Sequence, residues 1–443
     1  MTGGWDQILL VSTLSIPFST HRGYTRMEAN DLNTHRLGGI VGMQLSAMMF
    51  LQFFLWGAWY VTMGPFMAGS SMSPETIGWA YSVGPIAAIV SPFFLGLFAD
   101  RYFATERILG VLHLLGGVFL CLAPMAAEQS SSMFIGAIML HMLCYMPTLG
   151  LSNTLAMHNM TNAEKQFPLI RVFGTVGWIV AGIAISRLSY DTSANMFYLA
   201  GGSGLLLGVF SFLLPHTPPP AKGQKFSAKD AIGFDALSLM KDRSFAVFAV
   251  CSFLICIPLA AYYSFAGTFV GEMGIRNIGQ TMSYGQMSEV VFMVVMPLFF
   301  ARLGVKWMLA VGMLAWVARY GFFAGAADEQ IKWMVLSGIV LHGICYDFFF
   351  VTGQIYTDQV SGAKIRGQAQ GFLVLITQGL GMLIGAQLSG KLVGKFTTTV
   401  GEVSTTDWNS VWMYPAVFSF AVLIVFVLLF KGAKTSVPAD GES

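Results

Sequence analysis

The sequence contains very few charged side chains. Asp, Glu, Lys and Arg together make up 10% of its 443 residues, whereas soluble domains carry about 25%. So few charges cannot cover the surface of a water-soluble protein of this length. The formal net charge is only +2, which gives no strong field that would attract nucleic acid. The composition therefore predicts a surface that is covered mostly by lipid.

The residues from which chemical sites are usually built are also scarce. The five cysteines all lie within apolar runs and lack the spacing of metal ligands, so we interpret them as small hydrophobic packing groups. The sequence shows no metal-binding cluster, no nucleophile with a base beside it and no phosphate-binding loop. It therefore predicts neither an enzyme nor a bound metal or other cofactor.

Apolar residues, by contrast, are abundant. They make up 55% of the chain, with 37 Phe, 27 Met and 49 Gly, and continuous apolar runs long enough to cross a bilayer recur throughout. We place these runs at 43–67, 76–99, 107–127, 132–156, 168–187, 195–214, 244–270, 281–301, 306–326, 332–357, 367–390 and 408–430. A membrane-spanning barrel would show short alternating segments instead. The sequence predicts an all-α polytopic membrane protein with twelve transmembrane helices.

The positions of the basic residues predict the orientation of these helices. Lys and Arg are concentrated in alternate loops, and this set of loops includes both ends of the chain. By the positive-inside rule, both termini are expected in the cytoplasm. The predicted divisions are an N-terminal extension, a first bundle, a linker, a second bundle and a tail, at residues 1–42, 43–214, 215–243, 244–430 and 431–443. For the extension, Met27 is an alternative start that would shorten the chain.

The long polar segment at 215–243 divides the predicted helices into six and six. The end of the second span, Pro92–Arg101, resembles the end of the eighth, Pro297–Gly304. Two six-helix bundles around a central cavity form the architecture of the major facilitator transporters. The turn Gly96–Arg101 also resembles the loop between helices 2 and 3 of that superfamily. Asp100 and Arg101 are therefore expected either to act in gating between the bundles or to be plain interfacial charges.

Four ionisable residues are conspicuous within predicted spans, where each costs several kcal/mol unless it is paired, hydrated or functional. They are Arg171, Glu289, Arg319 and Asp347. Glu289 follows Gln286 by three residues, so the two share a helix face. An amide beside a carboxylate can hold hydroxyls or ring nitrogens, and the carboxylate can also take a proton. The alternative is an inward polar pair that connects two helices.

Arg171, Thr175 and Trp178 recur with helical spacing in the fifth predicted span. A fixed cation, a hydroxyl and an aromatic ring on one face suit a planar polar ligand. Arg171 lies only about one turn inside the helix, however, so it can also be an interfacial arginine whose charged end reaches the membrane surface.

His342 and Tyr346 share a face of the tenth predicted span. Asp347 is turned by about 100° from Tyr346 on an α-helix, so it is expected to meet a neighbouring helix. Arg319 is the nearest unassigned cation in the sequence. We expect either a buried Arg319–Asp347 ion pair or a role for Asp347 in a proton relay.

Motifs in six regions resemble the nucleoside:proton symporter family of the major facilitator superfamily. They are Phe50–Trp59 in the first span, Tyr145–Thr154 in the fourth, Phe167–Thr175 in the fifth, Gln286–Glu289 in the eighth, Tyr346–Phe349 in the tenth, and Asp407–Trp412 in the last loop. These motifs occur in the family's order and extend over most of the chain. The resemblance implies proton-driven uptake of nucleosides through a central cavity in the bacterial inner membrane.

The resemblance also assigns residues to that cavity. It implies substrate binding by a set of side chains on three spans: Arg171, Thr175, Trp178, Gln286, Glu289, His342 and Tyr346. In the family an aromatic ring stacks on the base and a Gln/Glu pair helps to hold the sugar. The mechanism it implies is alternating access, with Glu289 and Asp347 as candidate proton carriers.

The seventh span departs from the family pattern. Ala260 and Tyr263 stand at positions where relatives carry amide side chains. Two groups expected to recognise base or sugar are therefore missing. This leaves a proton-coupled transporter of another hydroxylated solute, such as a sugar, as an alternative. A membrane sensor on the same fold that transports nothing is a second alternative.

Overall fold

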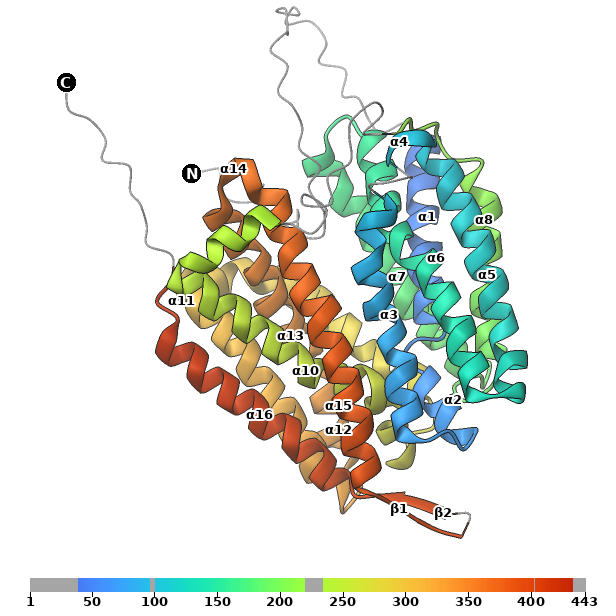
Figure 1. Cartoon of the computed structure of the whole chain (residues 1–443), viewed down its shortest axis with the longest axis vertical. Coiled ribbons are helices and arrows are strands. Elements are labelled where there is room, and N and C mark those ends of the chain that lie inside the picture. Colours follow the sequence, from blue (N-terminus) through green and yellow to red (C-terminus); the bar gives the residue numbers. More distant parts are fainter. Residues whose placement is uncertain (1–38, 96–99, 220–233, 402, 433–443) are drawn as a thin grey trace, which may run out of the picture.

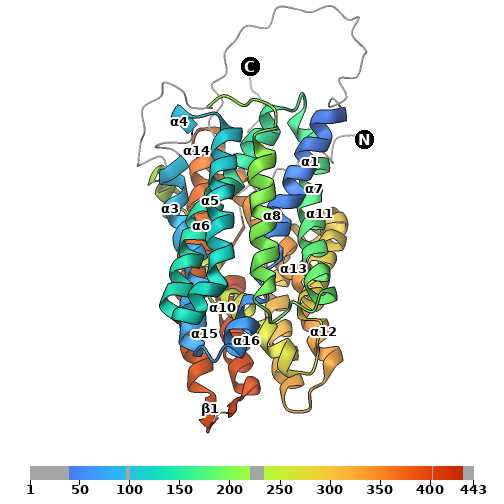
Figure 2. The same cartoon turned by 90° about the vertical axis from the view of Figure 1, so that its right-hand side faces the viewer.

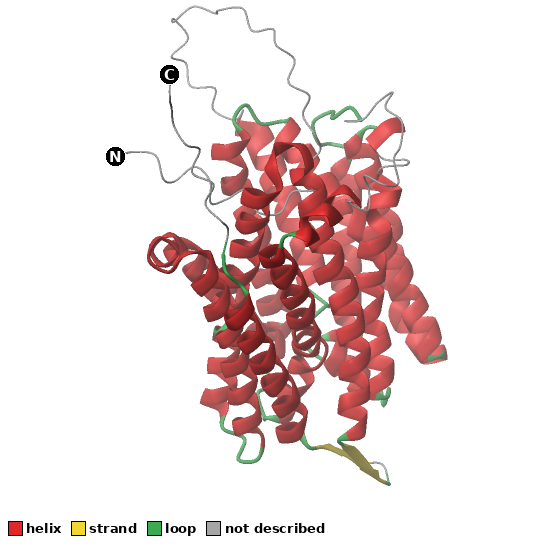
Figure 3. Cartoon of the chain, turned by 60° about the vertical axis from the view of Figure 1, so that its left-hand side comes forward, coloured by secondary structure: helices red, strands yellow, loops and turns green. Residues whose placement is uncertain are grey.

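The computed structural model describes residues 39–95, 100–219, 234–401 and 403–432. Most of the expected extension (1–38 of 1–42), of the expected linker (220–233) and of the expected tail (433–443) lies outside the described residues. The described chain is almost entirely helical, with one small antiparallel hairpin (Figure 3). An all-α membrane fold was the prediction from the sequence, and the structure confirms it.

The N-terminal helices occupy one side of the molecule and the C-terminal helices the other (Figure 1). The first group comprises α1 (Gly39–Gly57), α2 (Met63–Gly69), α3 (Pro74–Phe94), α4 (Asp100–Tyr102), α5 (Thr105–Gln129), α6 (Ser131–His158), α7 (Ala163–Arg187) and α8 (Asn195–Ser211). The second comprises η2 (Phe234–Lys241), α10 (Arg243–Glu272), α11 (Ile278–Ala327), α12 (Lys332–Val340), α13 (His342–Cys345), η3 (Tyr346–Val351), α14 (Thr352–Val374), η4 (Leu375–Gly381), α15 (Met382–Lys395), β1 (Thr397–Val400), β2 (Val403–Thr406) and α16 (Trp408–Leu429).

Ten helices among the described residues are long and apolar enough to cross a membrane. The other two predicted segments correspond to a shorter apolar helix, α8, and to a division within α11. At Gly304 the backbone of α11 leaves the helical region, with φ 64°. A positive φ suits glycine because it has no Cβ, so this residue separates the eighth predicted span from the ninth.

Polar residues mark where many of the helices begin. Ser73, Ser130, Asn162, Asp242 and Asp407 each accept a hydrogen bond from the backbone N–H three residues later. Such N-caps satisfy donors that the first turn of a helix leaves unpaired. The polar residues between apolar runs therefore fix the start of helices α3, α6, α7, α10 and α16.

The structure departs from the regular spans that the sequence predicts. The expected first span, 43–67, is interrupted by turns at 58–62, and α2 follows as a separate short helix. Two further segments, η3 and η4, have π-helical rather than α-helical hydrogen bonding. Such segments insert a residue into a helical turn and often occur at functional sites. Hydrophobic periodicity does not reveal them, because it assumes a constant number of residues per turn.

The two groups of helices pack against each other at the end of the molecule where the β1–β2 hairpin lies, which we call the hairpin end (Figures 1 and 2). There α7 packs on α11, and α3 packs on α15. Gly182 and Gly279 bring two backbones together: a Cβ added at Gly182 would lie 2.6 Å from the carbonyl oxygen of Gly279. Small residues at such crossings permit close packing of membrane helices.

Candidate functional site

The central polar side chains come from helices of both groups. On α7, Arg171 is half-buried, and its guanidinium carbon lies 4.1 Å from the centre of the Phe53 ring. This distance is within the range of a cation–π interaction. Further along the same face, Thr175 and Trp178 are also half-buried. Trp178 contacts the ring of Trp56 edge-on, with centroids 5.2 Å apart. The predicted stripe on α7 thus combines a cation, a hydroxyl and an aromatic surface.

The facing helix α11 supplies the amide and the carboxylate. Gln286 is 9% exposed, and its side-chain oxygen has no hydrogen-bond partner in the part of the chain that the structure describes. Glu289 is 17% exposed, and one of its oxygens lies 4.0 Å from Nε2 of His342. His342 in turn stacks on Tyr346, with ring centroids 5.9 Å apart. The structure therefore brings Glu289, His342 and Tyr346 together, and their predicted role in substrate binding stays a prediction.

Opposite charges face each other between the two groups of helices. The Arg171 cation interacts electrostatically with the Glu289 carboxylate and with the Tyr346 side chain. Within the part of the chain that the structure describes, Arg171 and Glu289 form no direct ion pair. A polar molecule placed between them would meet a hydrogen-bond donor on one side and an acceptor on the other.

The structure does not pair Arg319 with Asp347. Both residues are fully buried, but Arg319 donates to the Gly338 carbonyl oxygen and bonds to His342. Neither carboxylate oxygen of Asp347 has a hydrogen-bond partner among the described residues, and the charge that acts on Asp347 is that of Glu289. Asp347 lies in the π-helical segment η3, whose turn differs from the α-helix assumed for the prediction. The expected ion pair is therefore wrong for this conformation.

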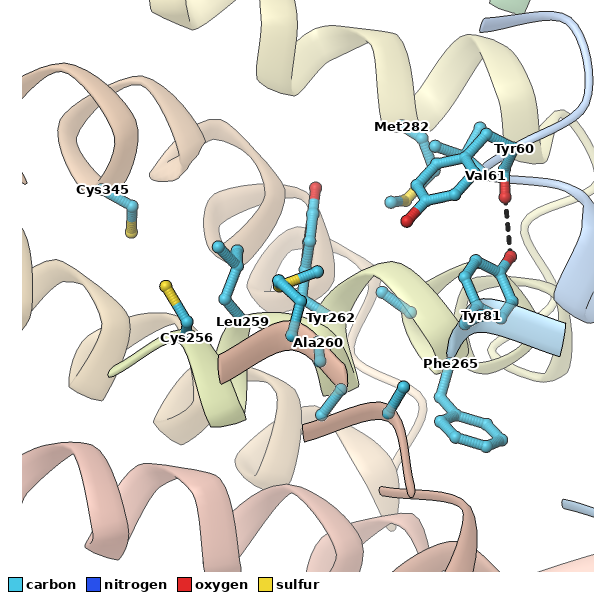
Figure 4. Close-up of a cluster of buried hydrophobic side chains, with 14 of the residues drawn as sticks. Tyr60, Val61, Tyr81, Cys256, Leu259, Ala260, Tyr262, Phe265, Met282 and Cys345 are labelled. Carbon is cyan, nitrogen blue, oxygen red and sulfur yellow. Dashed lines mark hydrogen bonds between the residues drawn. The ribbon is translucent and has the colours of Figure 1, made fainter. Parts of the chain in front are cut away.

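Sequence reasoning did not identify several aromatic residues around this cluster. Tyr60, just after α1, and Tyr263 on α10 meet across the two groups, with ring centroids 5.8 Å apart. The hydroxyl of Tyr81 donates to the Tyr60 carbonyl oxygen at 2.6 Å (Figure 4). In the sequence, Tyr263 stands out only because relatives carry an amide side chain at its position. Its place in an aromatic-rich span gave no signal that it reaches the other half.

The second departure, Ala260, is almost completely buried on α10, close to Tyr262 (Figure 4). A Cβ added at Gly385 of α15 would lie 2.7 Å from the Ala260 Cβ. A larger side chain at position 260 would therefore collide with α15 unless that helix moved. The small residue here is explained by helix packing.

The turn Gly96–Arg101, for which a gating role is predicted, is only partly described. Residues 96–99 and the side chain of Asp100 lie outside the described residues. Arg101 follows in the short helix α4 and is partly exposed. The predicted gating role of Asp100 and Arg101 therefore stays a prediction.

Comparisons with known proteins agree with this arrangement. The sequence profile of the nucleoside H+ symporter family matches residues 40–435. The chain is 39% identical over 407 residues to YegT of Escherichia coli K12, a protein inferred to be a nucleoside transporter, covering 89% of this chain and 95% of YegT. It is 30% identical to the xanthosine permease of Escherichia coli K12, covering 88% of this chain and 96% of the permease.

Solved structures show the same relationship. The crystal structure of the nucleoside transporter NupG superposes with a TM-score of 0.79 at 29% identity, covering 89% of this chain and all of that one (100%). A D-xylose–proton symporter shares the fold, with a TM-score of 0.67 at 15% identity over 89% of this chain and 99% of the symporter. Together with the family match, these similarities show that the chain belongs to the nucleoside H+ symporter family, whose members are proton-coupled transporters with the major facilitator fold and not enzymes.

Proposed function

We propose that a nucleoside and a proton bind between the two groups of helices, around Arg171 of α7 and Glu289 of α11. The observation that carries this proposal is that two opposite charges, one from each group, face each other without a direct ion pair among the described residues. A solute held between them would contact both halves at once. Rocking of the halves would then expose it to either side of the membrane, which is alternating access.

The surrounding side chains suit the parts of a nucleoside. Trp178 offers an aromatic surface for a planar base, beside the Thr175 hydroxyl. Gln286 and Glu289 provide an amide and a carboxylate for the hydroxyls of a sugar. Arg171 donates hydrogen bonds to carbonyl oxygens or ring nitrogens. His342 and Tyr346 complete the proposed site, since both rings lie beside Glu289.

Glu289 and Asp347 are the proposed proton carriers. Burying an unpaired carboxylate costs far more than burying the neutral acid. Both oxygens of Asp347 are buried without a partner in the described ranges, so a proton on this group stabilises the conformation described here. Release of that proton would favour a conformation in which water or a cation reaches the carboxylate. The protonation state of Asp347 would in this way couple proton transfer across the membrane to the rocking of the halves.

A second candidate substrate is another hydroxylated solute, such as a sugar. Ala260 and Tyr263 favour it, because two amides expected for nucleoside recognition are absent from α10. Phenol and methyl groups cannot replace the paired donor and acceptor of an amide. The hydroxyl-binding part of the proposed site, Gln286 with Glu289, is unaffected by this change.

The proposed location is the bacterial inner membrane, with both termini in the cytoplasm. The bias of Lys and Arg toward alternate loops supports this orientation. The halves pack together at the hairpin end, so the conformation described here would open toward the cytoplasm. Attachment of an impermeant reagent to a cysteine added in the hairpin, in whole cells, tests this orientation.

Uptake of radiolabelled uridine into proteoliposomes, with and without an inward proton gradient, tests the function. The expected result is uptake that the gradient stimulates and that other nucleosides inhibit. Gradient-driven uptake of a sugar but not of uridine would support the second candidate. Binding of uridine without any uptake by folded protein would contradict transport and support a sensor.

A further inference from the structure

Arg319 lies in α11 and is completely buried, yet it has no acidic partner among the described residues. Its Nε donates to the carbonyl oxygen of Gly338 at 3.1 Å. Its guanidinium carbon lies 4.2 Å from the centre of the Tyr262 ring. A second nitrogen, Nη2, lies 3.1 Å from Nδ1 of His342. The cation is thus held by a carbonyl, an aromatic face and a histidine.

The contact with His342 determines where the proton of the imidazole ring resides. An arginine side chain has five N–H donors and no acceptor. Nδ1 of His342 must therefore accept the hydrogen bond from Arg319, which requires that Nδ1 carry no proton. In a neutral imidazole the single proton is then on Nε2. Arg319 thereby selects one of the two tautomers of His342.

The orientation of the His342 ring is fixed by aromatic neighbours. Tyr262 stacks on it with centroids 5.5 Å apart and planes inclined by 18°. Tyr346 stacks with centroids 5.9 Å apart, and Tyr263 contacts the ring edge-on. The ring is 2% exposed, so it has little freedom to turn. Its Nε2–H is consequently held beside Glu289.

Nε2 of His342 and the nearest oxygen of Glu289 are 4.0 Å apart, too far for a direct hydrogen bond. A hydroxyl oxygen about 2.8 Å from both atoms would complete two hydrogen bonds. It would accept from Nε2–H and donate to the carboxylate. A hydroxyl can accept one hydrogen bond and donate another. A carbonyl oxygen can only accept, and a positively charged amine nitrogen can only donate.

We propose that Arg319 is a positioning residue that fixes His342 as a hydrogen-bond donor, and that His342 and Glu289 together bind one hydroxyl group of the solute. This inference deepens the proposed function, because it assumes that the solute binds beside Glu289. It gives a role to a buried arginine that has no carboxylate partner among the described residues. It also gives the site a preference for hydroxylated solutes that does not depend on the amides missing from α10.

Two substitutions of His342 separate the contact with Arg319 from the contact with the solute. In His342→Asn the shorter amide places its oxygen near the position of Nδ1, where it can accept from Arg319, but nothing reaches toward Glu289. In His342→Gln the longer amide places an N–H near the position of Nε2. We expect His342→Asn to raise the KM for uridine about tenfold with little change in kcat, and His342→Gln to restore most of the affinity. Equal KM values for the two variants would overturn the proposal.

The tautomer can be measured without transport. Nitrogen-15 NMR of histidine-labelled protein in membranes distinguishes protonated from bare ring nitrogens, and the His342 signals are those lost in His342→Gln. The expected result is a bare Nδ1 and a protonated Nε2 in the unmodified protein, and a mixture of tautomers in Arg319→Gln. A proton on Nδ1, or on both nitrogens, in the unmodified protein would overturn the assignment.

The two experiments also separate this inference from the proposed function. If the unmodified protein takes up no uridine, the nucleoside proposal fails, while the NMR result still decides the role of Arg319. If uridine is taken up but the NMR spectrum shows Nδ1 protonated, transport stands and the role of Arg319 is refuted.

Discussion

The carboxylate of Asp191 accepts a hydrogen bond from the backbone N–H of Gly279 at 2.7 Å, although the two residues belong to different halves of the protein. The same oxygen accepts from the Ser186 hydroxyl, and Ser186 accepts from the N–H of Gln280. The residue before α11, Asn277, provides no side-chain cap. The first turn of α11 is thus capped by the opposite half, so these bonds must break when the hairpin end opens.

We expect Asp191→Ala to favour opening of the hairpin end. A helix cap contributes about 1 kcal/mol, so its loss should shift the equilibrium about fivefold. The measurement is the rate at which an impermeant maleimide labels a cysteine placed at Ser283, which is buried beside Gly182. Asn162→Ala is the matched control, because Asn162 caps α7 from within its own half. Equal labelling rates with and without Asp191→Ala, both in the protein that carries the cysteine at position 283, would show that this cap does not hold the two halves together.

Gly182→Ala should disturb the same contact by steric overlap. The added Cβ would lie 2.6 Å from the Gly279 carbonyl oxygen and would collide with the Ser283 side chain. We expect slower uridine uptake and faster labelling at the hairpin end, because the two helices must separate to admit the methyl group. Gly202→Ala on α8 is the control, since its Cβ would meet no atom within 4 Å. If Gly182→Ala transports normally, the close approach is not needed for closure.

Asp347→Asn should uncouple transport from the proton gradient. The amide has no proton to exchange, so gradient-driven accumulation of uridine should fall to the level seen without a gradient, while exchange of labelled for unlabelled uridine continues. The comparison variant is Glu106→Gln, since Glu106 is a buried carboxylate that binds His216 and the Thr217 N–H away from the cavity. Full gradient stimulation in Asp347→Asn would remove Asp347 from the proposed coupling.

Glu289→Gln should weaken binding as well as coupling. A hydrogen bond to a charged group contributes about 1.5–3 kcal/mol, so the KM for uridine is expected to rise by at least about tenfold. The Gln side chain has nearly the same shape, which preserves packing against His342. Measurement of uridine affinity by equilibrium binding, alongside uptake, separates the two effects. An unchanged affinity would place the solute elsewhere in the cavity.

Gln52→Leu should destabilise the first half without affecting recognition directly. Gln52 is fully buried; its amide donates to the Thr148 hydroxyl at 2.7 Å, and its oxygen lies 2.7 Å from Nε2 of His113. The substitution removes both hydrogen bonds. The Thr148 hydroxyl keeps its bond to the Tyr145 carbonyl oxygen, but Nε2 of His113 loses its partner, and an unpaired buried polar group costs about 1–3 kcal/mol. A lower melting temperature in detergent, with an unchanged KM for uridine, is the expected result. A KM that rises while the melting temperature stays constant would instead give Gln52 a role in the site.

Helical spacing predicted which side chains share a helix face more reliably than it predicted which side chains form pairs. Arg171, Thr175 and Trp178 lie along one face of α7 because their spacing repeats that of an α-helix. The partner of Arg319 could not be predicted in this way. It depends on how α11 and α13 are placed relative to each other, and on the π-helical turn at Asp347. The spacing of residues along one helix carries no information about either.

The interruption of the first span at 58–62 likewise depends on packing. The sequence there is apolar throughout apart from Thr62, so composition alone favours a continuous helix. In the structure Tyr60 turns toward α10 and is fixed by Tyr81. Such a contact between distant segments leaves no periodic signal in the chain.

The close approach of Gly182 to Gly279 has a consequence for protein engineering and for evolution. Arg171, Thr175 and Trp178 continue along one stripe of α7 into Gly182 and Ser186. One helix face thus carries the proposed recognition residues at one depth and the contact between the halves at another. We expect substitutions at the first three positions to alter the choice of solute, while the last two preserve the surface on which the halves close. New substrate ranges can therefore arise on this fold without redesign of its moving parts.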